Sequence, residues 1–408
     1  MLHLNTHRGG DAVKQRECPC REGGAAGRQQ REPAAADRPL GVAAPPPHNA
    51  LKTSLLTALL ALAAVAAGRA AHPVAVVPVR LTQSAAIQWD GRNHETIDAR
   101  LNADPVSIHL GNCADIVISA CDLGAIELVE CKRVTIRNCW IHDSTNCGVS
   151  TYRCQQVLIQ GCRFERVASG VYALESQQIQ VVGNFARNVA GPFPRGQLAQ
   201  FDDVTGTGNV IRANYAINDL GQSHPEDVIS LFKSAGEQGS PLLIADNYMT
   251  GDPTQGSTGK SQNGSGIMLG DSGGAYLTCR SNVIINAGQV GMGVAGGRFI
   301  RVEDNLIYGR KSDVANVGLY VWNQSDKPSD HVSVMRNRVY WVNKTGEENS
   351  WWNGGNVQEV ELKDNHFADA ALATDLPAPP SCAPMPPQPW VSPGADGTSV
   401  ARLPWEPK

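Results

Sequence analysis

Four side chains in two nearby segments are of the types that acid–base chemistry on an acidic substrate requires. Arg195 and Asp203 lie in the first segment, and His224 and Lys233 lie in the second. A cation beside a substrate carboxylate neutralises its charge and so acidifies the proton on the adjacent carbon. A base can then remove that proton while an acid protonates the leaving oxygen. We therefore expect these four residues to form a catalytic group.

Other side chains near this group are expected to contact the substrate. They are Gln200, Asp202, Asp227, Asp271, Tyr172 and Trp322. The division of roles stays open at this point. Lys233 is either the base or an electrostatic clamp, and in the second case His224, Tyr172 or Tyr215 takes the role of base or acid.

The elements that must position these residues are short strands in a repeat. An apolar residue followed three positions later by Cys or Asn recurs along the chain, and successive Cys or Asn positions lie 18 to 35 residues apart. These positions are Cys121, Cys139, Cys162, Asn184, Asn214, Asn247, Asn305, Asn337 and Asn365, with a looser match at Asn282. A period of this size without helical periodicity predicts a parallel β-helix, an all-β solenoid of about ten coils.

A second strand aligns independently in six coils. Its alternate positions are apolar or small, which predicts two inward columns. The first column is Ile126, Val149, Val171, Ala199, Ile229 and Ile267, and the second is Leu128, Thr151, Ala173, Phe201, Leu231 and Leu269. Cys113, Cys131 and Cys154 are expected to fill the core in the same way, since buried cysteine behaves as a small apolar residue. The Asn column is expected to support turns and to bond to its stacked neighbours.

A charged column follows the last inward position of this strand. It contains Glu130, Arg153, Glu175, Asp203, Lys233 and Asp271, which an in-register solenoid stacks roughly 5 Å apart. The first three are expected to form a surface ladder of ion pairs. We expect Lys233 to lie between Asp203 and Asp271, whose carboxylates would raise the pKa of Lys233 and favour its role as a clamp. Coils also lengthen in this region, and long loops often carry function.

Both ends of the chain differ from the repeat. Residues 1–50 are expected to be disordered or an upstream extension of a misassigned start, and 51–71 read as a secretory signal with an apolar stretch of about a dozen residues. We expect residues 72–104 to cap the solenoid, 105–370 to form it, and 371–408 to be a disordered Pro-rich tail. Without residues 1–71 the formal charge changes from −4 to −8, because that segment holds nine Lys and Arg but five Asp and Glu. Such acidity disfavours nucleic acid as a partner.

The Cys and Asn columns between residues 100 and 368 resemble the right-handed parallel β-helix of the pectin-lyase-like superfamily. The segments "GPFPRGQLAQFD" and "SHPEDVISLFKS" are similar to β-helix polysaccharide lyases that act on alginate-type polymers. This resemblance implies an exported, secreted or periplasmic lyase that cleaves an acidic polysaccharide by β-elimination. We expect a monomer with no membrane span after signal removal, and no cofactor. A Ca²⁺ ion bound by Asp202, Asp203 and Asp227 is an alternative that no dense acidic loop motif supports.

Two other functions compete with the lyase. Asp203 and Asp271, two coils or ~9–10 Å apart, are near the upper limit for the carboxylates of an inverting glycoside hydrolase. The pair Asp202–Asp203 is similar to the double aspartate of β-helix polygalacturonases, although the Gly-His-Gly and Arg-Ile-Lys elements of that family are absent. A surface protein that binds sugar without cutting it is the third interpretation, with Trp322, Trp351 and Trp352 available for stacking.

Overall fold

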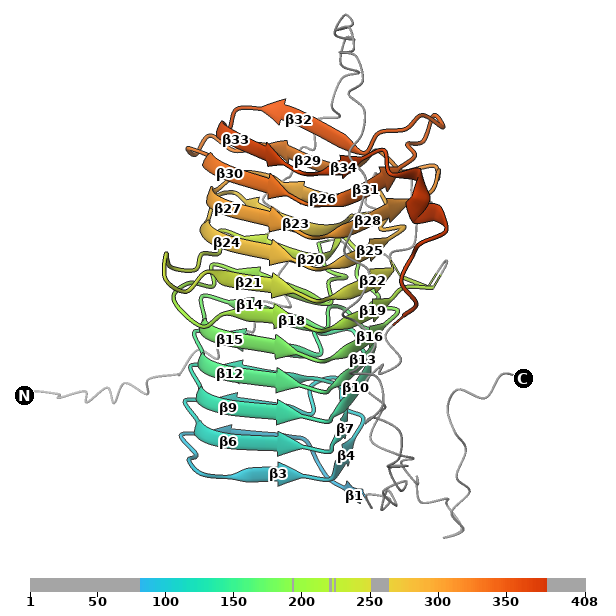
Figure 1. Cartoon of the computed structure of the whole chain (residues 1–408). Helices are drawn as coiled ribbons and strands as arrows, with labels where there is room; N and C mark the ends of the chain where they lie inside the picture. The colour runs from blue at the N-terminus through green and yellow to red at the C-terminus, as the bar shows by residue number, and fades with distance from the viewer. Residues whose placement is uncertain (1–80, 193, 220–221, 224, 251–263, 380–408) are drawn as a thin grey trace, which may run out of the picture. The chain divides into compact units, whose positions relative to one another are not determined.

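The computed structural model describes residues 81–192, 194–219, 222–223, 225–250 and 264–379. These residues form three parallel sheets of 12, 11 and 11 strands, which wind as a right-handed parallel β-helix with about eleven coils (Figure 1). The fold class predicted from the repeat is therefore confirmed, with about one coil more than expected. The signal segment and the upstream extension lie outside the described residues.

Every coil contributes one strand to each sheet, in the order first, second, third. The first sheet contains β1 (Thr82–Gln83), β4 (Arg100–Asn102), β7 (Asp122–Leu123), β10 (Trp140–Ser144), β13 (Arg163–Val167), β16 (Phe185–Arg187), β19 (Tyr215–Ile217), β22 (Tyr248–Thr250), β25 (Val283–Ile285), β28 (Leu306–Gly309), β31 (Arg338–Trp341) and β34 (His366–Phe367). The second contains β2 (Ile87–Asp90), β5 (Ile108–Gly111), β8 (Ile126–Val129), β11 (Val149–Tyr152), β14 (Val171–Leu174), β17 (Ala199–Asp202), β20 (Asp227–Phe232), β23 (Ser265–Asp271), β26 (Val290–Val294), β29 (Val317–Trp322) and β32 (Trp351–Gly355). The third contains β3 (Thr96–Asp98), β6 (Ala114–Ser119), β9 (Lys132–Arg137), β12 (Gln155–Gln160), β15 (Gln177–Val182), β18 (Val210–Arg212), β21 (Leu242–Ala245), β24 (Ala275–Arg280), β27 (Arg298–Glu303), β30 (Asp330–Met335) and β33 (Gln358–Lys363).

The inward columns of the second sheet lie as the period-2 pattern predicted. Val149 pairs with Ile126 and with Val171, and Phe201 pairs with Ala173 and with Leu231. All twelve predicted members are buried. Each coil hides its apolar side chains against the coils above and below, so the core runs along the solenoid axis.

The corner residues explain the Cys and Asn columns. Asn184, Asn214, Asn247, Asn282, Asn305, Asn337 and Asn365 form one ladder, in which each side-chain amide except the last donates to the next side-chain carbonyl at 2.9–3.0 Å. Cys162 continues this column, because its backbone N–H donates to Asn184 Oδ1. The left-handed residue of the corner is the one before the ladder position, such as Ala213 (φ 53°) and Asp246 (φ 56°). The ladder asparagines therefore hold the stack, and their neighbours make the turn.

The cysteines pack as expected. All eight in the described part of the chain are buried free thiols. Burial raises the pKa of the Cys139 thiol well above its usual value, as it does for Cys279. A thiol that stays protonated in an apolar core is unreactive, so these residues fill space.

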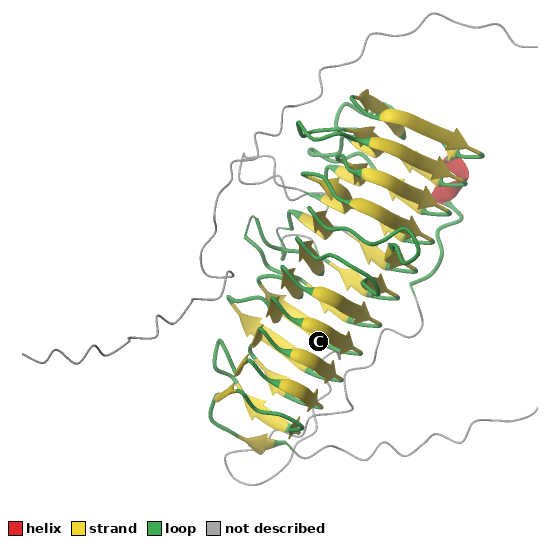
Figure 2. Ribbon diagram, turned by 90° about the vertical axis from the view of Figure 1, so that its left-hand side faces the viewer, coloured by secondary structure: helices red, strands yellow, loops and turns green. Residues whose placement is uncertain are grey.

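The longest loops lie next to strands of the second sheet. The segments between β16 and β17, β19 and β20, and β22 and β23 precede such strands, and the segment between β20 and β21 (residues 233–241) follows one, whereas the corners from the third sheet to the first stay short. All the long loops therefore reach the edge of the second sheet, as we expected for the region of Lys233. Figure 2 shows such loops beside the stacked strands.

Three expectations need correction. Strands β1 to β4 already lie in the three sheets, so coils begin within the range expected to be a cap. The predicted tail is ordered at its start, because the 3₁₀ helix η1 (Ala370–Ala373) and residues 374–379 are described. Leu372 and Leu376 pack there on an apolar cluster outside the first sheet, and Pro377 accepts a hydrogen bond from Tyr248 (3.4 Å). Residues 380–408 lie outside the described part.

The third correction concerns register. A β-bulge in β23 pairs Asp271 with Phe232 instead of Lys233, and the Lys233 backbone N–H donates to the Asp271 carbonyl (2.9 Å). Gly270 (φ 64°) is the inserted residue of this bulge. Asp271 thus belongs to the column of Asp202 and Phe232, and Ser272 (φ 56°) takes the corner position after Lys233. The predicted triplet Asp203–Lys233–Asp271 does not exist.

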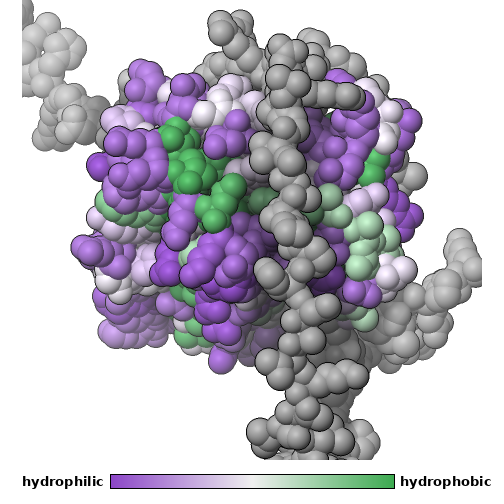
Figure 3. Space-filling view, turned by 45° about the horizontal axis from the view of Figure 1, so that its top comes forward, coloured by the Kyte–Doolittle hydropathy of each residue, from purple (hydrophilic) through white to green (hydrophobic). Residues whose placement is uncertain are grey.

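The C-terminal end of the solenoid carries mainly hydrophilic side chains, with hydrophobic ones in small separate areas (Figure 3). Leu362 in the last coil is 48% exposed, the one large hydrophobic side chain that is exposed among the described residues. No helix in the described residues is long and apolar enough to cross a membrane.

Candidate functional site

One row of side chains runs along the outer face of the second sheet. It contains, coil by coil, His109, Glu127, Ser150, Tyr172, Gln200, Ser230 and Met268, which pair in register. We call this the outer row. A second row beside it contains Asp202, Phe232 and Asp271. Five of the seven outer-row residues are both polar and buried. A sheet face with a purely structural role does not require buried polar side chains.

The two rows meet in a compact cluster around Asp202. Tyr172 donates a hydrogen bond from its hydroxyl to Asp202 Oδ2 (2.9 Å). The Arg195 guanidinium carbon lies 4.2 Å from the centre of the Tyr172 ring, and Arg195 Nη1 donates to Gln200 Oε1 (3.3 Å). Lys233 Nζ lies 4.7 Å from the Phe232 ring centre. Arg195, Gln200, Asp202, Tyr172 and Lys233 are therefore brought together from four segments of the chain.

Electrostatics at Asp202 are unusual for a surface carboxyl. Burial raises its pKa, and the charge of Asp203 adds to this effect. The Tyr172 hydrogen bond and the charges of Lys233 and Arg195 act in the opposite direction but do not cancel it. A carboxyl whose pKa is raised while two cations stand nearby is suited to proton transfer.

The loop before β17 holds Arg195 over the sheet. The Arg195 backbone N–H donates to the Pro192 carbonyl (2.8 Å), and its carbonyl accepts from the Glu226 N–H (3.2 Å). Gln197 Nε2 bonds to both Pro194 O (2.9 Å) and Glu226 Oε2 (3.3 Å). These bonds join the two loops that precede β17 and β20, so the Arg195 side chain starts from a fixed backbone.

The remaining predicted residues lie apart from this cluster. Asp203 is exposed at the corner, and Asp227 is buried, where it accepts the Ser265 backbone N–H (2.9 Å). Trp322 lies four coils beyond Asp202 along the second sheet, where the centres of the Trp322 and Trp352 rings are 5.5 Å apart. His224 lies outside the described residues. The catalytic and binding roles of all these residues stay predictions.

An aromatic area follows the cluster toward the C-terminus. Tyr320 lies across Gly293, where an added Cβ would be 2.5 Å from the Tyr320 ring, and its hydroxyl reaches Met268 Sδ (3.3 Å). Gln324 donates to the same hydroxyl (2.7 Å). The glycine therefore makes room for the ring on the sheet face.

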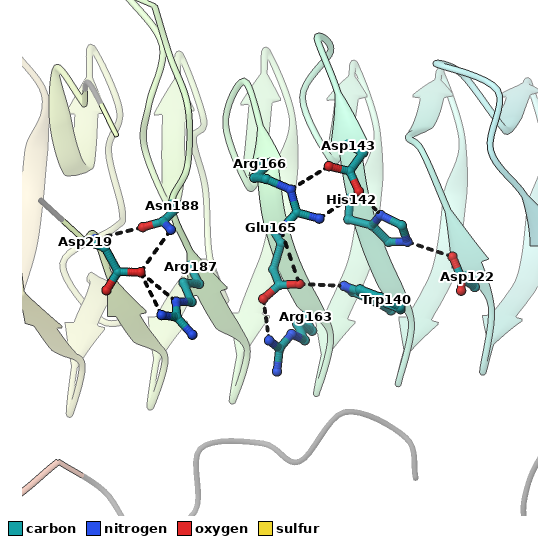
Figure 4. A network of polar contacts seen from close by, with 10 residues as sticks. All are labelled: Asp122, Trp140, His142, Asp143, Arg163, Glu165, Arg166, Arg187, Asn188 and Asp219. Carbon is teal, nitrogen blue, oxygen red and sulfur yellow. Dashed lines mark hydrogen bonds and ion pairs between the residues drawn. The ribbon is translucent and has the colours of Figure 1, made fainter. Parts of the chain in front are cut away.

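The first sheet carries a second polar network, which the sequence analysis missed (Figure 4). His142 lies between Asp122 Oδ1 (2.8 Å) and Asp143 Oδ2 (2.6 Å), and Arg166 binds Asp143 with two nitrogens (2.5 and 2.7 Å). Trp140 stacks on His142 with ring centres 3.9 Å apart. The charged side chains labelled in Figure 4 pair with one another across neighbouring coils, which indicates a network that joins these coils.

One ion pair of the expected ladder in the charged column is present. Arg153 Nε binds Glu175 Oε2 (2.8 Å), and both side chains are at least 40% exposed. In the described part of the chain, no group of three or more His, Cys, Asp or Glu side chains is arranged to hold a metal ion.

Comparisons with known proteins agree with this fold. A family profile described as "Right handed beta helix region" matches residues 85–226. An exopolygalacturonase from Thermotoga maritima has a TM-score of 0.36 and 12% identity, over 64% of this chain and 56% of that one. The periplasmic alginate epimerase AlgG has a TM-score of 0.31 and 13% identity, over 67% and 73%.

PfbA, a surface adhesin of Streptococcus pneumoniae, has a TM-score of 0.40 and 8% identity, over 71% and 75% of the two chains. No curated protein sequence matches this chain. The chain thus spans little more than half of the exopolygalacturonase. Likenesses at this level carry no argument about this chain, and its function has to be argued from the site.

Proposed function

We propose that this protein cleaves a uronic-acid polysaccharide by β-elimination at the Asp202 cluster. The observation that carries the proposal is the presence of two cations, Arg195 and Lys233, around a carboxyl that is bonded to a tyrosine hydroxyl. Cations next to the sugar carboxylate stabilise the negative charge that develops when the neighbouring proton leaves. A carboxyl with a raised pKa is a stronger base than an ordinary aspartate.

Asp202 is the proposed base and Tyr172 the proposed acid. Asp202 takes the proton from ring carbon 5, the electron pair forms a double bond between carbons 4 and 5, and the bond to the leaving oxygen breaks. Tyr172 gives its hydroxyl proton to that oxygen and regains one from Asp202 through their 2.9 Å hydrogen bond. The proton of carbon 5 thus ends on the leaving oxygen, and no other reactant is needed. Lys233 acts as a clamp, since its charge acts at Asp202, where the sugar carboxylate would lie.

The test is to incubate the chain with alginate, polygalacturonate and related polyuronans. New ultraviolet absorbance together with new reducing ends indicates elimination, because only elimination creates the conjugated double bond. Reducing ends without absorbance indicate hydrolysis. Polymer binding without either product would contradict both enzyme functions and favour a surface protein that binds sugar.

Hydrolysis is the second candidate, and the corrected register favours a specific pair for it. Asp202 and Asp271 share one row and lie two coils apart. At ~4.8 Å per coil their spacing is ~9–10 Å, at the upper limit for an inverting hydrolase. The raised pKa of Asp202 would suit the general acid, and Asp271 would activate water. Asp271→Asn then separates the candidates, because it abolishes hydrolysis but leaves elimination in place.

A further inference from the structure

A histidine–glutamate pair on the same face, nearer the N-terminus, is not used by the proposed reaction. His109 Nδ1 lies 3.2 Å from Glu127 Oε2, and the two residues are directly paired between β5 and β8. Glu127 is 6% exposed, whereas the His109 side chain is 39% exposed. The pair therefore has one deeply placed member and one that solvent reaches.

Glu127 has an unused acceptor. Its Oε1 atom is buried and has no hydrogen-bond partner, although Oε2 is bonded to His109. A buried carboxylate oxygen without a donor costs free energy, so such an atom in a native structure points to an absent partner. A carboxylate accepts only, so the absent partner must be a donor.

The place of the pair in the outer row sets its distance from the Asp202 cluster. From Glu127 the row passes Ser150 and Tyr172 and reaches Gln200, three coils later. At ~4.8 Å per coil this is ~14 Å along the sheet. A pyranose ring is about as long as one coil step, so a polymer lying along the row would place a ring at Glu127 about three rings from the reacting one.

We infer that His109 and Glu127 form a sugar-binding subsite that accepts hydroxyl hydrogens of a ring about three residues from the point of cleavage. Glu127 Oε1 accepts a sugar hydroxyl, and His109 holds the carboxylate in place through Oε2. The inference rests on the proposed function, because that function supplies the polymer. It adds that the polymer lies parallel to the solenoid axis and that affinity increases once a substrate is long enough to reach β8.

The experiment measures binding of uronate oligosaccharides of increasing length by calorimetry, in full-length Asp202→Asn protein, which does not cut them. Glu127→Gln keeps the shape of the side chain but replaces one oxygen by a donor. Binding of oligosaccharides that span three coils should weaken about tenfold or more, since a hydrogen bond to a charged group is lost. Shorter ones should bind as before. Glu175→Gln is the matched control, since Glu175 is an exposed member of the corner ladder.

Three results contradict the inference in different ways. Equal affinity of Glu127→Gln and Glu175→Gln proteins for long oligosaccharides would overturn the subsite but leave the proposed function intact. Absence of binding and cleavage by the unsubstituted chain would overturn the proposed function, and the subsite with it. An equal loss for short and long oligosaccharides would also overturn the subsite, because it would show a general effect on the face.

Discussion

Tyr172→Phe removes one oxygen atom from the centre of the proposed site. The ring that packs under Arg195 stays, with its centre 4.2 Å from the guanidinium carbon, whereas the 2.9 Å hydrogen bond to Asp202 is lost. A hydrogen bond to a charged group contributes about 1.5–3 kcal/mol. At about 1.4 kcal/mol for each factor of ten, this bond alone accounts for about 10- to 100-fold. Because Tyr172 is also the proposed acid, kcat/KM should fall about 10²- to 10⁴-fold in all.

The pH dependence of the rate gives a sharper result than its size. The Tyr172 hydrogen bond lowers the pKa of Asp202 against the effect of burial. Without the hydroxyl that pKa rises further, so a higher pH is needed to ionise the base. The acidic limb of the pH–rate profile should therefore move to higher pH in the Tyr172→Phe protein.

Tyr152→Phe is the matched control, measured by the same ultraviolet assay. Tyr152 lies one coil earlier on the same sheet and also carries an arginine over its ring, with Arg153 4.7 Å from the ring centre. Its hydroxyl makes no hydrogen bond to Asp202, so neither rate nor profile should change. The reasoning is refuted if the two proteins have the same rate and the same acidic limb.

Three further predictions concern activity and stability. Asp202→Asn should lower kcat about 10²- to 10⁴-fold as the base is lost. Burial raises the pKa of Asp202 in the folded protein, so the stability that its protonated form contributes is complete below the ordinary aspartate pKa and is lost as pH rises through the raised pKa. Denaturant unfolding at neutral pH should therefore show the Asn protein to be at least as stable as the unsubstituted chain. Asn247→Ala removes the acceptor of the Asn214 side-chain amide and backbone N–H and the donor to Ile211 O and Asn282 Oδ1, so urea unfolding should show a loss of about 3 kcal/mol or more. Arg212→Ala, in an exposed ion pair one coil earlier, should lose less than about 1 kcal/mol, and equal losses would contradict the ladder. Burial lowers the pKa of His142, but its bonds to Asp122 and Asp143 outweigh burial and raise the pKa overall; Arg166 is also bound to Asp143, and Trp140 is stacked on the His142 ring. The stability that charged His142 contributes is complete below about pH 6.5 and is lost as pH rises through the raised pKa. His142→Gln should therefore lower the melting temperature more at pH 5 than at pH 9.

Much of the fold was predictable because a solenoid repeats its physical constraints in every coil. The inward columns follow from the alternation of apolar residues along each strand. The Cys and Asn column at the corners follows from the recurrence of residues that are small enough to stack. Register at Asp271 was not predictable in this way, since Gly270 inserts one residue without breaking the apolar pattern around Leu269. A single bulge therefore moved a predicted neighbour of Lys233 to the next row.

The candidate site was predictable only in part. Counting along strands placed Gln200 and Asp202 on the outer face next to Lys233, and the long loop before them placed Arg195 at the strand edge. The hydrogen bond between Tyr172 and Asp202 joins adjacent rows of neighbouring coils, which a strand alignment does not describe. The network at His142 was missed because Asp122, His142 and Arg166 share no motif and meet only through the stacking of coils.

The formation of an unsaturated uronate is the most direct measure of the central claim that the Asp202 cluster performs β-elimination. The unsubstituted chain should produce ultraviolet absorbance and reducing ends in equal numbers from at least one polyuronan. Lys233→Ala should lose this activity while keeping the melting temperature of the parent. Lys233 is exposed, and its Nζ lies over the Phe232 ring at the surface of the sheet. Full activity of a folded Lys233→Ala protein, or reducing ends without absorbance, would contradict the account.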